Sequence, residues 1–317
     1  MKRIVAAVQA FGAGILFVVI AYFSAVYFKD LLDPGAIGSE TDVLANQAVA
    51  DCAERRCDSL NLGALAGFQS LQRLPASVVG LAHLDTLDLG GSAIHDLAPL
   101  AELEGLGTLN LSYAPIMDLA SLPARSDLHH LVLNGVPARD FSPVAAYDGL
   151  EVFAAGWTSF DDLSLLTAVD TLTRLHLPET AVRDLSPLSD LSGLELLDLR
   201  KSGFDTLVTL PQLDGLKVLK LDYAALVSLE GIRRLPALEE LHLRATSVTD
   251  LRPLIGLPAL NTLYLDGGRF HDVTQLTQVP GLRTVSLIEV RGVTSDQLSQ
   301  LRQAGITVKL QAFEMEE

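Results

Sequence analysis

Arginine, histidine, tyrosine and aspartate side chains recur at intervals of 22 residues in the second half of the chain, beside short Leu-x-Leu segments. Such an array favours binding of a protein or peptide, because Arg and Tyr are the side chains that most often anchor interfaces. The candidate partner-binding residues are Arg174, His176, Asp198, Arg200, Lys201, Lys220, Asp222, Tyr223, His242, Arg244, Tyr264 and Asp266. An alternative stays open, because opposite charges on adjacent strands also stabilise a stack that binds nothing.

These side chains match no catalytic or metal-binding motif. His176 and His242 lie three intervals of 22 residues apart. If each interval adds one strand at about 4.8 Å, the two rings are about 14 Å apart, too far to share a metal ion. The chain contains no Gly-rich phosphate loop and no HExxH or GxSxG motif. We therefore expect a protein that is not an enzyme and that has no metal and no cofactor.

The two cysteines, Cys52 and Cys57, occur in the segment CAERRC. A zinc site is not favoured because no histidine lies nearby, and a catalytic cysteine would need a paired base that the local sequence lacks. Two interpretations remain. In an oxidising compartment the pair could form a disulfide that closes a short loop, or the chain carries two unreacted thiols.

A leucine recurs every 22 residues through the middle of the chain. Its positions are Leu84, Leu106, Leu128, Leu150, Leu172, Leu194, Leu216, Leu238, Leu260 and Leu282. This register indicates a stacked solenoid. Within each unit the Leu-x-Leu segment alternates with a period of two, which predicts a short strand with one buried face. The residues that flank the two leucines should therefore face the open, concave side of the stack.

The other side of each unit should be tight turns or 3₁₀ segments, because 22 residues leave little room for a full helix. Aspartates at one phase of the repeat are expected to cap these turns: Asp96, Asp118, Asp140, Asp162, Asp184, Asp250 and Asp272. Prolines that follow them fit a first helical turn, namely Pro99, Pro143, Pro187 and Pro253. The predicted fold is an α/β solenoid, a right-handed superhelix with a parallel concave sheet and a convex side of short 3₁₀ or turn segments.

The unit LTRLHLPETAVRDLSPL at residues 172–188 shows the pattern clearly. With its many copies, the chain resembles the bacterial leucine-rich repeat family, in the 22-residue class of internalin-like proteins. The resemblance implies a recognition module that binds through its concave strand face. The chain departs from that family where Asn usually follows the strand. The residues in that column are Ser92, Ala114, Val136, Thr158, Thr180, Ser202, Ala224, Thr246, Gly268 and Val290.

The N-terminal segment 4–28 carries no charge and follows Lys2 and Arg3. As a helix it would be about 37 Å long, enough to cross a hydrocarbon core of roughly 30 Å. We favour an uncleaved signal anchor over a cleaved signal peptide, whose apolar region is shorter. The positive-inside rule then places the N-terminus in the cytoplasm of a bacterial inner membrane and the repeats in the periplasm or outside the cell.

These patterns divide the whole chain into five segments. The expected organisation is a cytoplasmic stub at 1–3, a transmembrane signal anchor at 4–28, a linker and helical cap at 29–59, the leucine-rich repeat solenoid at 60–292 and a C-terminal cap at 293–317. The cap at 29–59 should contain a helix over about 40–56, and Thr294 and Gln297 should begin a helix that ends at Gly305 and is followed by a last strand.

The sequence thus predicts a membrane-anchored protein whose concave face binds a protein or peptide. The alternative is an accessory or scaffold subunit of a membrane complex, held by its transmembrane helix. With a net charge of −16, the chain is not expected to bind nucleic acid, since phosphate binding needs a clustered basic face.

Overall fold

The computed structural model describes residues 34–63, 71–123 and 126–310, with side chains from residue 41 onward. The expected stub at 1–3 and membrane span at 4–28 lie outside these residues. Among the residues that are described, no helix is long and apolar enough to cross a membrane.

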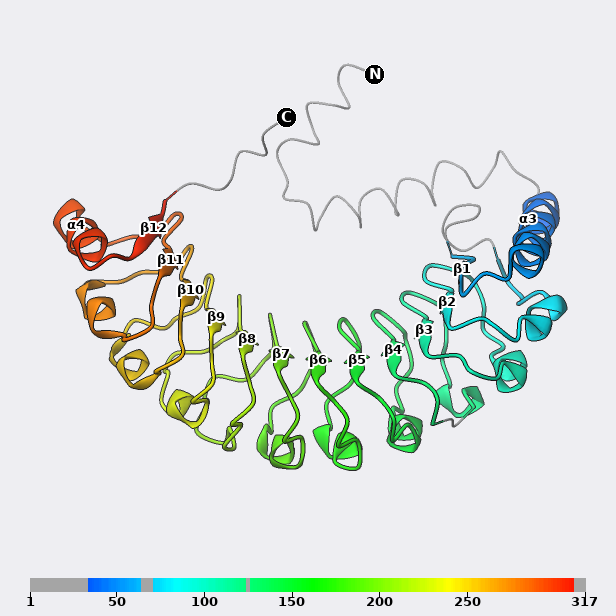
Figure 1. Ribbon diagram of the computed structural model, residues 1–317, viewed down its shortest axis with the longest axis horizontal. Coiled ribbons are helices and arrows are strands. Elements are labelled where there is room, and N and C mark those ends of the chain that lie inside the picture. The colour runs from blue at the N-terminus through cyan, green and yellow to red at the C-terminus, as the bar shows by residue number, and fades with distance from the viewer. Residues whose placement is uncertain (1–33, 64–70, 124–125, 311–317) are drawn as a thin grey trace, which may run out of the picture.

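One parallel sheet of twelve strands forms the inner side of an arc, with the strands side by side in chain order (Figure 1). The strands are β1 (Ser59–Asn61), β2 (Thr86–Asp88), β3 (Thr108–Asn110), β4 (His130–Val132), β5 (Val152–Ala154), β6 (Arg174–His176), β7 (Leu196–Asp198), β8 (Val218–Lys220), β9 (Glu240–His242), β10 (Thr262–Tyr264), β11 (Thr284–Ser286) and β12 (Thr307–Lys309).

The strand register follows the leucine spacing. Leu87 pairs with Leu109, which pairs with Leu131, so each repeat places its buried leucine beside that of the next. The ten leucines spaced by 22 residues all lie in one hydrophobic core, and none is more than 8% exposed. Burial of each leucine contributes roughly 1.5–3 kcal/mol. The predicted solenoid with one continuous core is confirmed.

Short 3₁₀ helices form the convex side. They are η1 (Ala76–Gly80), η2 (Ala98–Glu102), η3 (Leu119–Ser121), η4 (Ser142–Ala146), η5 (Leu163–Leu166), η6 (Ser186–Asp190), η7 (Ile232–Arg234), η8 (Arg252–Gly256) and η9 (Thr274–Gln278). Each predicted capping aspartate accepts a hydrogen bond from the backbone N–H two residues later, for example Asp140 from Ser142 at 2.8 Å.

Between β7 and β8 the chain forms turns only. In that repeat Thr206 replaces the aspartate and Thr209 replaces the proline. The Thr206 hydroxyl still accepts a hydrogen bond from the Val208 N–H, at 3.2 Å. The four repeats in which proline lies three residues after the aspartate each form a five-residue 3₁₀ helix, and so does the Asp272 repeat, in which Gln275 stands at the proline position.

The column that replaces the family's Asn contributes only part of the turn hydrogen bonds. Thr158, Thr180 and Thr246 each donate from their hydroxyl to the carbonyl three residues earlier, at 2.6–2.9 Å. The buried Ser92 hydroxyl has no partner among the described residues. No continuous side-chain ladder therefore runs along this edge of the solenoid.

Helix α3 (Pro34–Arg55) covers the N-terminal end of the core. The predicted helix began at about residue 40, so its start was placed too late. Proline is favoured in the first turn because its missing N–H needs no partner there, so Pro34 can begin the helix. Cys52, in the last turn of α3, forms a disulfide with Cys57, which follows the helix, and their Cα atoms are 5.0 Å apart.

Helix α4 (Ser295–Gln303) and β12 close the other end. The predicted capping box is present, with the Thr294 side chain accepting from the Gln297 N–H. Gly305 follows the helix with φ of 83°, and β12 then extends the sheet by pairing Val308 with Val285. The helix and the last strand thus lie at the positions expected from the sequence.

Candidate functional site

The predicted binding residues lie in three adjacent columns of the concave face. The first column stands on the strands themselves and holds His176, Asp198, Lys220, His242 and Tyr264. The second follows the strands and holds Arg200, Asp222, Arg244 and Asp266. The third column is one residue further along and includes Lys201 and Tyr223. Arg174 begins β6 and is exposed beside the first column.

Every residue of the third column has a left-handed backbone, with φ between 51° and 75°. The column consists of Gly91, Tyr113, Gly135, Trp157, Glu179, Lys201, Tyr223, Ala245, Gly267 and Glu289. From Gly91 to Gly267 the bend is held because the N–H of each residue donates to the next repeat, as from Lys201 to the Asp222 carbonyl at 2.8 Å and from Tyr223 to the Arg244 carbonyl at 2.7 Å. The strand end therefore imposes this conformation whatever side chain is present.

Asp198 is the centre of the first charged cluster. Arg200 donates to both carboxylate oxygens, with Nη2 to Oδ2 at 2.7 Å, and His176 Nδ1 lies 3.7 Å from Oδ2. Burial opposes ionisation of this carboxyl, but the hydrogen bonds from His176 and Arg200 and the charge of Arg200 outweigh it and lower the pKa of Asp198 well below its ordinary range. The Asp198 carboxyl is thus ionised at neutral pH.

His242 lies at the centre of a second cluster. One ring nitrogen contacts Glu240 and the other lies 3.7 Å from Asp222. The ring stacks on Tyr264 with centroids 4.2 Å apart, and the Arg244 guanidinium lies 5.2 Å from the centre of the same tyrosine ring. Burial, followed by the Glu240 charge, raises the pKa of the Tyr264 phenol. This packing holds an arginine over an aromatic ring on the concave surface.

A third cluster joins the left-handed column. Lys201 Nζ lies 2.6 Å from Glu179 Oε1, and the Trp157 indole N–H also donates to Glu179. The hydrogen bond from Lys201 lowers the pKa of the Glu179 carboxyl, burial opposes that shift, and the Trp157 bond adds to it. Three consecutive repeats are therefore linked side chain to side chain along this edge.

The ion pairs are layered, with the carboxylate below and the cation above. Arg200 is 43% exposed and Asp198 1%, Lys201 53% and Glu179 35%, Arg244 41% and Asp266 13%. The aspartates also accept backbone N–H groups, Asp222 from Arg244 and Asp266 from Ile288. The predicted patch thus divides into aspartates that hold the stack together and cations and aromatic rings that face solvent.

Two predicted residues take no part in these clusters. Lys220 pairs in register with Asp198 and His242, yet its ammonium has no ion pair among the described residues. Arg174 contributes only a weak charge effect on Glu195, whose main partner is Lys217. Both cations remain available to a ligand.

Sequence reasoning missed Glu179 and Glu240 and left Trp157 outside the patch. Glu240 begins β9, in the column directly before the strand leucine, from which only Arg174 was included in the predicted patch. Glu179 and Trp157 share the column of Lys201 and Tyr223. The repeat did contain a signal. Glycine occupies this column in three repeats, at Gly91, Gly135 and Gly267, whereas other repeats place a charged or aromatic residue there.

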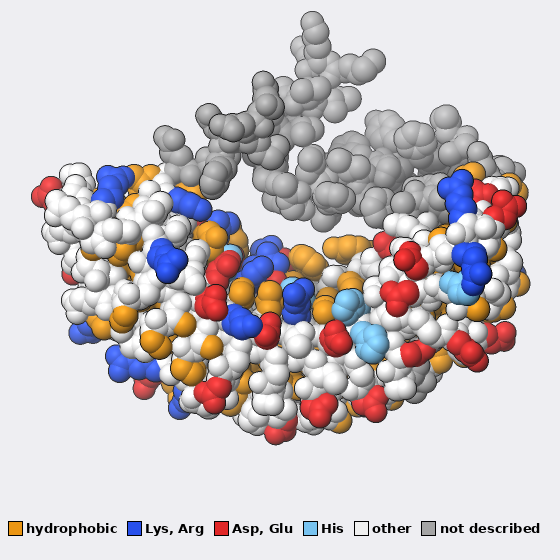
Figure 2. Space-filling model, in the orientation of Figure 1, with side chains coloured by type: hydrophobic (Ala, Val, Ile, Leu, Met, Phe, Trp, Pro, Cys, Tyr) orange, Lys and Arg blue, Asp and Glu red, His pale blue; other side chains and the backbone are white. Residues whose placement is uncertain are grey.

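Figure 2 shows charged and hydrophobic side chains gathered along the inner edge of the arc. A hollow of about 190 Å³ lies within this region and is bounded by the columns described above. Its lining residues are Trp157, Pro178, Glu179, Arg200, Lys201, Asp222, Tyr223 and Arg244. Five of these eight, Arg200, Lys201, Asp222, Tyr223 and Arg244, belong to the predicted patch. The eight come from five repeats, so no single sequence motif brings them together.

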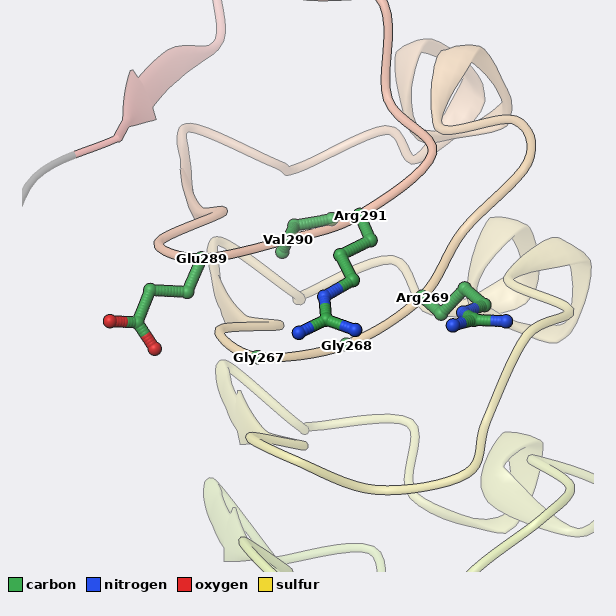
Figure 3. A pocket seen from close by; sticks show the side chains of 6 residues that line it. All are labelled: Gly267, Gly268, Arg269, Glu289, Val290 and Arg291. Carbon is green, nitrogen blue, oxygen red and sulfur yellow. The ribbon is translucent and has the colours of Figure 1, made fainter.

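A second recess, of about 690 Å³, lies between the last turns of the solenoid (Figure 3). Arg269 and Arg291 line it from consecutive repeats joined by a parallel bridge. Arg291 extends towards Gly268, whereas Glu289 points away. None of the residues that line this recess belongs to the predicted patch.

No family model matches the chain, and no curated protein matches it in sequence. Solved structures do resemble it. An internalin (inlF) from Listeria monocytogenes is 18% identical, with a TM-score of 0.68, over 84% of this chain and 87% of that one. A leucine-rich repeat protein of Leptospira interrogans is 20% identical, with a TM-score of 0.65, over 78% and 67%. The chain has an internalin-like leucine-rich repeat fold.

The leucine-rich repeat solenoid is also similar to a plant peptide hormone receptor, RGFR1, solved in complex with RGF2. The two are 17% identical, with a TM-score of 0.53, over 80% of this chain and 49% of the receptor chain. The shared feature is the repeated strand and turn that forms the concave sheet.

Proposed function

We propose that this leucine-rich repeat protein binds a protein or peptide partner through its concave face. The observation that carries the proposal is the layer of exposed cations and aromatic rings above buried carboxylates, at Arg200, Lys201, Tyr223 and Arg244. Arg and Tyr in this setting are typical interface anchors. Support also comes from the similar receptor RGFR1, which was solved with RGF2 bound.

Recognition suits this face better than catalysis. Its carboxylates are already paired with cations or with backbone N–H groups, so none is placed to exchange protons with a substrate. Among the residues that the structure describes, no group of three His, Cys, Asp or Glu side chains could hold a metal ion.

The test is partner recovery with variants chosen from the structure. Replacing Arg200 by Glu would place a second carboxylate beside buried Asp198 and would destabilise the fold. The changes Lys201→Gln and Tyr223→Gly are preferred because both side chains are exposed. Cross-linking and recovery with this double variant should lose the partner that the wild-type protein retains. Arg252→Gln, on the convex side and 73% exposed, is the control. Equal recovery by all three proteins would reject the concave face.

The proposal includes a membrane anchor at residues 4–28, with the repeats on the periplasmic or extracellular side. The uncharged run and the preceding Lys2 and Arg3 support it. A phosphatase that is active only outside the cytoplasm, fused after Glu317, should be active. A fluorescent protein that folds only in the cytoplasm should be dark at the same position. The reverse pattern would reject this topology.

A further inference from the structure

The hollow at the centre of the concave face differs in charge from the rest of the chain. Its lining includes three cations, Arg200, Lys201 and Arg244, and two carboxylates, Glu179 and Asp222, although the whole chain carries a net charge of −16. Asp222 is only 8% exposed and is engaged by the Arg244 N–H and by His242. A ligand entering the hollow therefore meets the cations first.

These cations keep donors that their intramolecular partners do not use. Arg200 binds Asp198 through Nε and Nη2, which leaves Nη1 free, and Lys201 uses one of its three ammonium protons on Glu179. A carboxylate above the hollow can therefore be bound without displacing Asp198 or Glu179. Charge-assisted hydrogen bonds of this kind are stronger than those between neutral groups.

Two aromatic rings flank Arg200 and Lys201 along the solenoid axis. Trp157 is 47% exposed and Tyr223 is 60% exposed, and they lie three repeats apart, which is about 14 Å at about 4.8 Å per strand. An extended peptide advances about 3.3 Å per residue, so about four residues separate the two rings. Side chains i, i+2 and i+4 share one face of such a peptide.

The backbone at these two rings is held in a conformation that suits glycine. Trp157 has φ of 55° and Tyr223 of 61°, a left-handed backbone that is unfavourable for a residue with a Cβ. Gly135 and Gly267 occupy the same column without that cost. Glycine can therefore replace Tyr223 without a change of backbone conformation, so such a variant removes only the ring.

We propose that the hollow binds an extended partner segment with the pattern apolar-x-acidic-x-apolar. The acidic side chain meets Arg200 and Lys201, and the two apolar side chains pack on Trp157 and Tyr223. This inference rests on the proposed function and specifies its ligand. The required order of side chains follows from the strand spacing, so a one-residue shift of the acidic group turns it to the opposite face.

Trp157 is the only tryptophan in the chain, so its fluorescence reports the hollow directly. The probe is a blocked peptide, Gly-Leu-Ser-Glu-Ser-Leu-Gly, titrated into the full-length protein. Its controls are Gly-Leu-Glu-Ser-Ser-Leu-Gly, which has the same composition, and the probe with Gln in place of Glu. The probe should shift and saturate the Trp157 emission, and both controls should bind at least about tenfold more weakly.

Variants separate binding from folding. Tyr223→Gly removes a ring while relaxing the backbone, so the protein should stay folded and lose at least about tenfold in probe affinity. Tyr113→Gly makes the same change outside the hollow and should leave the affinity unchanged. Equal binding of the two peptides of one composition, or no binding at millimolar concentration, overturns the proposed ligand.

Calorimetry distinguishes this failure from failure of the proposed function. A peptide that binds by calorimetry without changing Trp157 emission overturns the hollow as its site. The proposed function fails separately, if partner recovery is unaffected by the Lys201→Gln and Tyr223→Gly variant.

Discussion

Arg200 donates to both carboxylate oxygens of Asp198, the residue two positions before it on the same side of β7. The aspartate is nearly inaccessible while the arginine is 43% exposed. Arg200 therefore pairs with a buried carboxylate within the stack and also presents its guanidinium to solvent. Removal of Arg200 would leave a buried charge with only His176 and a backbone N–H as partners, and such charges are costly.

Arg200→Ala is expected to lower the free energy of unfolding by about 2 kcal/mol, because Asp198 loses its main partner. Lys201→Ala should cost less than about 1 kcal/mol, because its ion pair with Glu179 is largely exposed to water. Urea unfolding of the two variants measures the difference. Similar losses for both would show that the layering of the ion pairs has no energetic consequence.

The left-handed column predicts opposite effects of alanine and glycine. Ala245→Gly should stabilise the protein by about 0.5–1 kcal/mol. Ala245 has φ of 51°, a left-handed conformation that disfavours a residue with a Cβ, and its methyl group adds little stabilising contact there. Gly267→Ala should destabilise it by about 1 kcal/mol. A Cβ at Gly267 would meet no atom closer than 3.7 Å, so the loss would report conformation alone. Thermal unfolding of both variants should move in opposite directions.

Much of this architecture follows from the sequence because the repeat tests each inference many times. The leucines at intervals of 22 residues fixed the strand register, and the aspartates fixed the turns that begin the 3₁₀ helices. Helix α3 has no such repetition, and its start was predicted at about residue 40 although the helix begins at Pro34. Local patterns are strong where copies agree and weaker at the N-terminal cap.

The candidate site was predictable as a face but not as a set of contacts. The column positions of Arg200 and Tyr223 followed from strand alternation. The bond from Trp157 to Glu179 joins two repeats through side-chain rotamers, which no spacing encodes. The division between Asp198, which is buried, and Arg200, which is exposed, likewise depends on packing against neighbouring strands.

Acid should destabilise the convex turns. Hydrogen bonds from the residue two positions later lower the pKa of five turn carboxyls below their ordinary value of 3.8, at Asp140, Asp162, Asp184, Asp250 and Asp272. A lowered pKa contributes stability that is present above pH 3.8 and is lost as the pH falls through the shifted value. Urea unfolding from about pH 6 to about pH 2 should show this loss.

A variant isolates the contribution of these turns to the acid response. With Asp140→Asn, Asp184→Asn and Asp250→Asn combined, an amide oxygen can still accept the backbone N–H, but no proton is taken up. The unfolding free energy of this variant should depend less steeply on pH below 3.8. An unchanged slope would assign acid sensitivity to other groups, such as buried Asp198, whose pKa is also lowered.

Reduction of the disulfide should loosen one end of the solenoid. Cys52 and Cys57 close a loop of about six residues. Such a crosslink stabilises the folded protein by about 2 kcal/mol, because it lowers the conformational entropy of the unfolded chain. Contacts in a solenoid reach only neighbouring repeats, so amide exchange should rise in α3 and β1 and stay unchanged in α4. A Cys52→Ala and Cys57→Ala variant should exchange as the reduced protein does, with or without reductant. Faster exchange throughout the sheet on reduction would instead mean that the N-terminal cap and the repeats unfold as one cooperative unit.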